Sequence, residues 1–185
     1  MGTVKSLLLG MCFVLGACTS QTSTVQTTEK GTQWEWQNGT IVVKTPERPA
    51  GQKSVLGLTT PKLEAVRVGF VGLGMRGPGA VERFTYIPGT QVVALCDYEE
   101  ARADKCQELL KKASMPKAAV YSGDKGYEEL CKRDDIDLVY IAADWLHHFP
   151  VAKCALENGK NVAIEVPSAM NLQECWDLIN LRDRK

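Results

Sequence analysis

Apolar positions divide the chain into a regular part and an irregular part. From residue 66 onward, short apolar runs alternate with segments in which apolar residues recur at helical spacing. The expected strands are 66–72, 91–97, 138–143 and 161–167, with a weaker one at 118–122, and the expected helices are 77–87, 99–113, 126–133, 149–159 and 171–185. This alternation is typical of βαβ units around a buried parallel sheet. Right-handed crossovers then favour an α/β, Rossmann-type doubly wound fold over residues 65–185.

The first 18 residues follow a different pattern. After Lys5, an apolar run of 11 residues from Leu7 to Ala17 ends at Cys18. A membrane-spanning helix needs roughly 20 apolar residues, so this run is typical of a secretory signal peptide instead. The segment LGAC resembles a bacterial lipobox, which predicts a lipid on Cys18 and export to the periplasm or cell envelope of a Gram-negative bacterium. MGTVKS also fits a loose N-myristoylation pattern at Gly2, but the adjoining apolar run argues against that reading.

Residues 19–64 lack regular alternation and are expected to form a tether and an N-terminal arm. The stretch 19–33 is rich in Thr, Ser and Gln and is expected to be a solvated tether. One short strand is expected after a turn at Asn38 and Gly39, and the rest is expected to be loop.

Charge and cysteine content narrow the classes of function. Lysine plus arginine and aspartate plus glutamate each number 22, so no basic surplus indicates nucleic acid. The seven cysteines include no C-x-x-C pair, so no metal site is expected. Five of them follow the leader, and we expect small buried residues rather than a disulfide framework. The sequence leaves open whether the protein forms a homo-oligomer.

The segment GLGMRG holds Gly72, Gly74 and Gly77 in G-x-G-x-x-G register between an expected strand and an expected helix. In this context the first glycine permits a tight turn, the second admits a pyrophosphate, and the third allows close helix–strand packing. The helix N-terminus adds N–H groups and partial positive charge for the phosphates. Asp97 ends the second strand, where a carboxylate accepts hydrogen bonds from ribose and repels a 2′-phosphate. The sequence therefore predicts NAD rather than NADP, although Arg76 in the turn weakens that preference.

A second group of polar and aromatic residues follows the last two expected strands, at the sheet edge where doubly wound folds bind ligands. Within ADWLHHFP, Trp145 is expected to cover the nicotinamide side of the dinucleotide. His148 either hydrogen-bonds or shuttles a proton there, or packs at a helix start. His147 takes part in the site or faces solvent. Glu165 is either a cofactor ligand or a carboxylate satisfied by backbone N–H groups.

Together these motifs resemble the Gfo/Idh/MocA family of nucleotide-dependent oxidoreductases. In that family a GxGxxG turn, an acidic residue after the second strand, a T-P-N-x-x-H segment and an E-K-P segment recur in this order. Here Ala143, Asp144 and Trp145 stand in place of T-P-N, His148 is retained, and Val166 replaces the lysine. The family's dehydrogenases use that lysine beside the substrate hydroxyl and nicotinamide. Valine has no transferable proton, so ordinary alcohol dehydrogenation by that route is not expected.

A closer similarity, from about Val55 to the end, is to glycoside hydrolase family 109, the NAD-dependent α-N-acetylgalactosaminidases. The matching segments are VLGL, PKLEAVRVGFVGLGMRGPGAVERFTYI, VVALCD, DIDLVYIAADWLHH and NVAIEVPSAMNLQECW. The resemblance implies cofactor contacts at Met75, Arg76, Asp97, Trp145, Leu146, His147, His148, Glu165 and Val166. Exported members are usual in this family, which agrees with the leader.

The resemblance also implies a substrate and a reaction. Tightly held NAD+ oxidises the C3 hydroxyl of an N-acetylgalactosamine-containing glycan, elimination expels the group at C1, water adds, and the hydride returns. The paired carboxylates of ordinary glycosidases are then unnecessary. Membrane attachment through Cys18 is the second expected partnership.

The end of the chain bears on activity. The last expected helix has no cap and no following strand, so we expect a Rossmann domain incomplete at its C-terminus. Members of family 109 continue into a second α/β domain that carries the sugar-binding and proton-transfer residues. We therefore expect an inactive chain, in which His148 is the one catalytic candidate. A sugar or polyol dehydrogenase and a non-catalytic NAD-binding remnant stay as alternatives.

Overall fold

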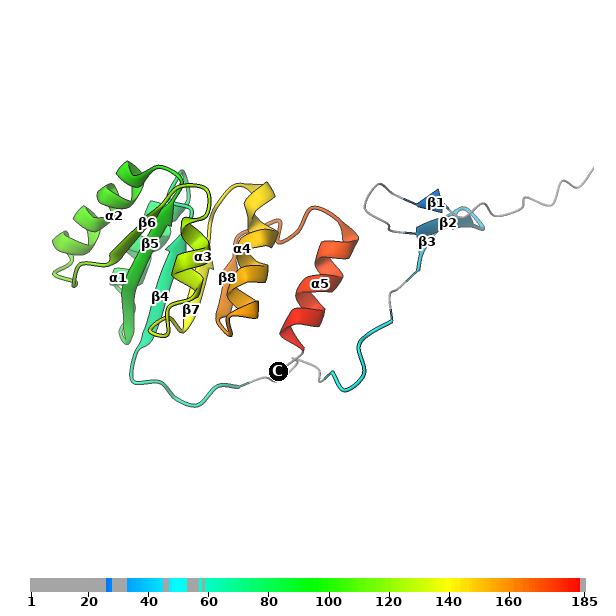
Figure 1. Cartoon of the computed structure of the whole chain (residues 1–185), viewed down its shortest axis with the longest axis horizontal. Coiled ribbons are helices and arrows are strands. Elements are labelled where there is room, and N and C mark those ends of the chain that lie inside the picture. The colour runs from blue at the N-terminus through cyan, green and yellow to red at the C-terminus, as the bar shows by residue number, and fades with distance from the viewer. Residues whose placement is uncertain (1–25, 28–32, 45–46, 53–56, 58, 184–185) are drawn as a thin grey trace, which may run out of the picture.

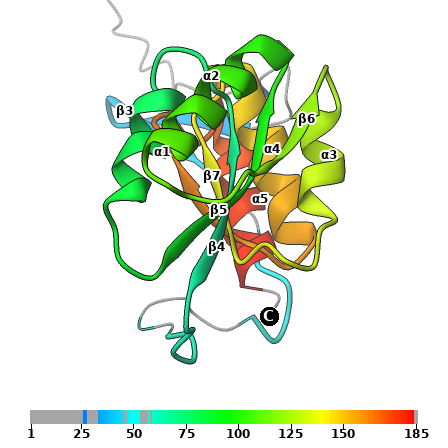
Figure 2. The ribbon, with the colours of Figure 1, turned by 90° about the vertical axis from the view of Figure 1, so that its left-hand side faces the viewer.

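The computed structural model describes residues 26–27, 33–44, 47–52, 57 and 59–183. Its main body is a parallel sheet of β4 (Val66–Val71), β5 (Thr90–Asp97), β6 (Ala119–Ser122), β7 (Leu138–Ile141) and β8 (Asn161–Ile164). The helices are α1 (Gly77–Thr85), α2 (Glu100–Lys112), α3 (Gly126–Cys131), α4 (Trp145–Glu157) and α5 (Leu172–Arg182). The strand order is β6-β5-β4-β7-β8, and all pairings are parallel (Figures 1 and 2). The predicted doubly wound α/β fold is therefore confirmed.

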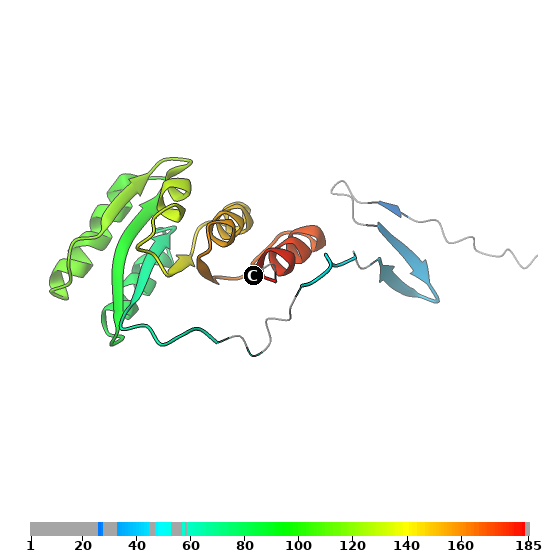
Figure 3. The same ribbon diagram turned by 60° about the horizontal axis from the view of Figure 1, so that its bottom comes forward.

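Two apolar layers cover opposite faces of the sheet. One joins Phe70 of β4 to Val81 of α1 and Leu110 of α2. The other joins Ile141 of β7 to α3 and to Val151 of α4. Because both faces are covered, the central strands are apolar almost throughout, which explains why their runs were visible in the sequence. The helix α5 packs beside α4 and buries none of its own described residues (Figure 3).

The start of α4 differs from the prediction. The sequence pattern predicted a start at Phe149. The helix begins at Trp145 instead, because Oδ1 of Asp144 accepts a hydrogen bond from the backbone N–H of Leu146 at 2.9 Å. Pro150 therefore lies inside the helix, and residues 145–148, which precede the predicted helix, form its first turn.

The N-terminal arm also contains more structure than predicted. The strands β2 (Gln33–Gln37) and β3 (Thr40–Val43) form an antiparallel hairpin, and β1 (Gln26–Thr27) pairs with β2 inside the stretch expected to be a tether. Asn38 and Gly39 both have positive φ, as a tight hairpin turn requires. The register places Trp36 opposite Ile41, so the segment before the turn is a strand as well.

The remaining predictions concern the leader, the cysteines and membrane-spanning helices. The leader and Cys18 lie outside the described residues. The cysteines Cys96, Cys106 and Cys131 are free and buried, as expected, whereas Cys175 is exposed on α5, so burial was wrong there. Within the described ranges, no helix combines the length and apolar character that a membrane crossing requires.

Candidate functional site

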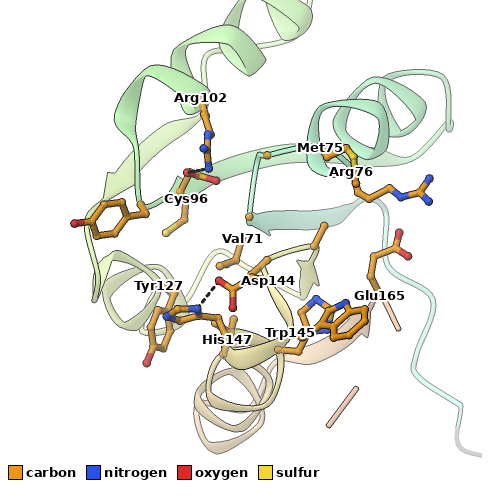
Figure 4. Close-up of a pocket in the computed structure, with 18 of the residues that line it drawn as sticks. Val71, Met75, Arg76, Cys96, Arg102, Tyr127, Asp144, Trp145, His147 and Glu165 are labelled. Atoms are coloured by element: carbon orange, nitrogen blue, oxygen red, sulfur yellow. Dashed lines mark hydrogen bonds and ion pairs between the residues drawn. The ribbon is translucent and has the colours of Figure 1, made fainter. Parts of the chain in front are cut away.

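A cavity of about 970 Å³ opens at the carboxyl edge of the sheet (Figure 4). It lies where the chain order reverses between β4 and β7, which is the usual ligand site of doubly wound folds. The lining residues come from the ends of β4 and β5, from the segments after β4, β5, β6, β7 and β8, and from α2, α3 and α4. Of the predicted site residues, those that line it are Gly72, Gly74, Met75, Arg76, Asp97, Trp145, His147, His148, Glu165 and Val166. Gly77 and Leu146 do not line the cavity.

The glycine turn lines one side of this cavity, and each glycine has a different role. Gly72 has a φ of +90°, and a Cβ there would lie 2.3 Å from the backbone nitrogen of Ala143. A Cβ on Gly77 would lie 2.1 Å from the carbonyl oxygen of Gly72, so this glycine closes the turn itself. At Gly74, by contrast, the nearest atom to a Cβ is 3.8 Å away, on Arg102. Gly74 is therefore the position at which a ligand can approach the backbone.

Asp97 is 5% exposed and holds the glycine turn in place. Its Oδ2 accepts a hydrogen bond from the backbone N–H of Leu73 at 2.6 Å. Its Oδ1 accepts from the backbone N–H of Glu99 at 3.0 Å and from the Arg102 guanidinium at 3.2 Å. Arg102 also donates to Glu99 at 2.9 Å. The carboxylate predicted to meet a ribose is therefore already fixed by the protein, with lone-pair capacity left on Oδ2.

The first turn of α4 contributes a pair formed by Asp144 and His147. Oδ2 of Asp144 lies 2.6 Å from Nδ1 of His147, while its Oδ1 caps the helix. Burial raises the pKa of Asp144, but the hydrogen bonds from His147 and from nearby backbone N–H groups outweigh it, so the pKa lies below its ordinary value. His147 thus lines the cavity as well as reaching solvent. Leu146, expected at the cofactor, faces solvent at 74% exposure.

His148 is 1% exposed, which agrees with packing at a helix start. Its Nδ1 lies 2.7 Å from the carbonyl oxygen of Pro167. A carbonyl oxygen only accepts, so Nδ1 donates this hydrogen bond and Nε2 is the ring nitrogen left for a ligand. Nε2 is buried and, within the described structure, has no hydrogen-bond partner. This histidine packs at the helix start and also offers an unpaired ring nitrogen to the cavity that it lines.

Glu165 and Val166 follow β8 at the far end of the cavity from Asp97. The sequence left Glu165 either as a cofactor ligand or as a carboxylate satisfied by backbone N–H groups, and in the structure a tyrosine side chain contacts this carboxylate. Its Oε1 accepts a hydrogen bond from the phenol of Tyr140 at 2.7 Å. Val166 is 81% exposed at the cavity surface. Tyr140 and Arg102 are contact residues that sequence reasoning missed, and no local motif marks either of them.

These groups fit an extended dinucleotide. The glycine cradle lies after β4, the Asp97 carboxylate lies at the end of β5, and Glu165 follows β8 on the opposite side of β7. A pyrophosphate at the glycine turn would direct the two halves of a dinucleotide toward these two carboxylates. Among the residues that the structure describes, no cluster of three or more His, Cys, Asp or Glu side chains is arranged to hold a metal ion.

Comparison with sequence relatives supports a dinucleotide site in this cavity. The Gfo/Idh/MocA family, described as an oxidoreductase family with an NAD-binding Rossmann fold, matches residues 66–185. Over 184 residues the chain is 78% identical to glycosyl hydrolase family 109 protein 4 of Phocaeicola vulgatus. That match covers 99% of this chain and 36% of the relative, so the chain spans about a third of the relative's length.

Solved structures give the same fold. The myo-inositol dehydrogenase of Lactobacillus casei, in complex with NAD(H) and myo-inositol, has a TM-score of 0.56 at 25% identity, over 63% of this chain and 33% of that one. A 3-ketoreductase of Actinomadura kijaniata, in complex with NADP and TDP-benzene, has a TM-score of 0.55 at 26% identity, over 64% of this chain and 35% of that one. The chain therefore belongs to the Gfo/Idh/MocA oxidoreductase family, carries its NAD-binding Rossmann domain, and has close relatives named as glycosyl hydrolase family 109 proteins.

Proposed function

We propose that this chain is the NAD-binding part of an exported glycosidase that hydrolyses α-N-acetylgalactosaminides. The observation that carries the proposal is the exposed Val166 beside Glu165 in the cavity. A lysine at this position would serve net alcohol oxidation, and valine cannot exchange a proton. The 78% identity to a family 109 protein supports the same choice.

The residues of the cavity have separate tasks in this proposal. Gly74 leaves room for the pyrophosphate, and Asp97 accepts a hydroxyl of the adenosine ribose. The unused Nε2 of His148 accepts an N–H or O–H of the ligand, and Trp145 shields the far half from water. Bound NAD+ supplies a hydride acceptor that is restored in each turnover, so the overall reaction is hydrolysis without net oxidation.

The test uses a protein that continues this chain over the remaining length of its family 109 relatives. We expect release of p-nitrophenol from p-nitrophenyl α-N-acetylgalactosaminide, loss of activity after NAD is removed, and recovery when NAD is added back. In D2O the product should acquire deuterium at C2, because elimination removes that proton and water returns one. Hydrolysis without C2 exchange would contradict the proposal.

Two further outcomes separate the alternatives. Accumulation of NADH from free N-acetylgalactosamine would favour a sugar dehydrogenase. We expect residues 1–185 alone to bind NAD and to release no p-nitrophenol, since they span 36% of the relative's length. Turnover by this chain alone would contradict that expectation.

Export is a separate part of the proposal and rests on the leader sequence alone. We propose cleavage before Cys18 and lipid attachment at that residue. Cys18→Ser is expected to move the protein from the membrane fraction of the producing bacterium to a soluble fraction or to leave it unprocessed. Unchanged membrane association of this variant would contradict a lipid anchor.

A further inference from the structure

Tyr140 is a half-buried residue of β7, and its ring is fixed by aromatic packing. The ring centroid lies 5.3 Å from that of Phe70 on β4 and 5.7 Å from that of Phe84 on α1. Phe70 and Phe84 meet edge to face at 5.2 Å, which closes a three-ring cluster. The position of the Tyr140 hydroxyl is therefore set by the core between β4, β7 and α1.

That hydroxyl reaches out of the core to the end of β8. It lies 2.7 Å from Oε1 of Glu165, a residue that lines the cavity. Burial first, and then the hydrogen bond to Glu165, raise the pKa of Tyr140, against an opposing effect of Arg83. The phenol therefore keeps its proton at neutral pH and donates to the carboxylate.

The backbone supports the same placement from the other side. The backbone N–H of Glu165 donates to the carbonyl oxygen of Ile141 at 3.0 Å, one residue beyond Tyr140. Glu165 is thus held both at its backbone and at one carboxylate oxygen by β7. In Figure 4 the Glu165 side chain lies on the same side of the cavity as Trp145, away from Arg102. The other carboxylate oxygen remains for a ligand hydroxyl.

We propose that Tyr140 is a positioning residue, which fixes the Glu165 carboxylate so that its second oxygen accepts a hydroxyl from the nicotinamide half of the cofactor. The inference rests on the proposed orientation of NAD, with adenosine at Asp97. No aromatic or hydroxyl motif assigns this role, because Tyr140 lies within an apolar strand. Its contribution depends on contact with one side chain 25 residues away.

The experiment is a double-mutant cycle on ligand affinity. Tyr140→Phe keeps the ring and removes only the hydroxyl, and is expected to weaken NAD binding about fivefold, since a hydrogen bond to a charged group is lost. Glu165→Ala is expected to weaken it further, and Tyr140→Phe should have no added effect in that background. ADP, which lacks the nicotinamide half, should bind all of these variants as it binds the unchanged protein.

Tyr121→Phe is the matched control. Tyr121 lies on β6, the edge strand at the other side of the sheet from β8, and does not line the cavity. Its hydroxyl accepts a hydrogen bond from the Arg133 guanidinium at 3.1 Å. This variant should keep its NAD affinity, and thermal unfolding of both tyrosine variants verifies that each is folded. Equal weakening of NAD and ADP by Tyr140→Phe would indicate a general structural defect and overturn the proposal.

Other outcomes identify which claim fails. If the unchanged protein binds NAD but Tyr140→Phe binds it equally well, the positioning role is wrong and the NAD site stands. If Tyr140→Phe weakens NAD equally with and without Glu165, the hydroxyl does not act through the carboxylate. If the unchanged protein binds neither NAD nor ADP, both the cofactor site and the positioning role are overturned.

Discussion

The two ends of the cavity are built in opposite ways. At the β5 end, Asp97 is buried and its oxygens are engaged by Leu73, Glu99 and Arg102. At the β8 end, Trp145 and Val166 are 60% and 81% exposed, and the Glu165 carboxylate accepts a hydrogen bond from Tyr140. Both ends carry a carboxylate. Asp97 is hydrogen-bonded to the backbone of the turn, whereas Glu165 lies beside exposed side chains.

In the proposed orientation of NAD, the β5 end holds the adenosine half and the β8 end holds the reactive nicotinamide half. A rigid β5 end suits the adenosine half, which only has to be held. An open β8 end, with an unused buried nitrogen on His148, suits the nicotinamide half, where a substrate must approach. The β5 end is therefore expected to govern both folding and affinity, whereas changes at the β8 end should affect ligand binding alone.

The largest expected effect is at the glycine turn. Gly72→Ala would place a Cβ 2.3 Å from backbone at a φ of +90°, and we expect it to lower the free energy of unfolding by about 3 kcal/mol or more. Gly74→Ala is the control, because a Cβ there meets nothing closer than 3.8 Å. It should keep its thermal stability and lose NAD affinity. Equal stability of the two variants would contradict the assigned roles.

The next effect is at Asp97. Asp97→Asn replaces an acceptor oxygen with an N–H2 group that faces backbone N–H groups, so we expect about tenfold weaker NAD binding and a smaller preference for NAD over NADP. Asp104→Asn removes the same charge from an exposed position on α2. Calorimetric titration with each cofactor measures the change. An unaltered NAD to NADP ratio in Asp97→Asn would show that this carboxylate does not select the cofactor.

A smaller effect is expected at the opposite edge of the sheet, where Arg67 pairs with Asp137. The Arg67 hydrogen bond, opposed by burial, lowers the pKa of Asp137 below its ordinary value of 3.8. A depressed pKa stabilises the fold above the unfolded value, and this stabilisation is lost as the pH falls through the folded value. Unfolding midpoints of the unchanged protein and Asp137→Asn should therefore differ at neutral pH and converge below 3.8. NAD affinity at neutral pH should be equal in both, and a loss in Asp137→Asn would contradict the separation of this edge from the cavity.

The smallest effect is a pattern of thiol reactivity. Burial raises the pKa of Cys96 to about 12 and that of Cys106 to about 11, so neither should react with iodoacetamide at mildly alkaline pH while the protein is folded. Cys175 is exposed and should be modified first. Mass spectrometry after short labelling identifies the sites, and unfolding in guanidinium is the control that should expose all three. Labelling of Cys96 as fast as Cys175 would show that the β5 end opens readily.

The β5 end was also the part that sequence could predict. Gly72, Gly74 and Asp97 form a local motif whose spacing follows from one strand, one turn, one helix and the next strand. The β8 end depends on contacts between distant residues, such as Tyr140 with Glu165 and His148 with Pro167, which no spacing rule reveals. The start of α4 was predicted at Phe149 instead of Trp145, and the reason is local.

Two signals competed at that helix start. Asp144 is a good N-cap and Pro150 is a good first-turn residue, and the cap prevailed. In the arm, the strand after the turn at Asn38 and Gly39 was predicted, but its hairpin partner, in which Trp34 and Trp36 alternate with polar residues, was not. Strands and glycine turns were therefore predictable from the sequence, whereas side-chain contacts between distant residues could be identified only from the folded structure.

The most direct test of this account is calorimetric titration of the chain with NAD and, separately, with ADP. We expect one NAD per chain, competition between the two ligands, and tighter binding of NAD than of ADP, because the β8 end adds contacts to the nicotinamide half. NAD binding that is no tighter than ADP binding would contradict a dinucleotide site that spans both ends of the cavity.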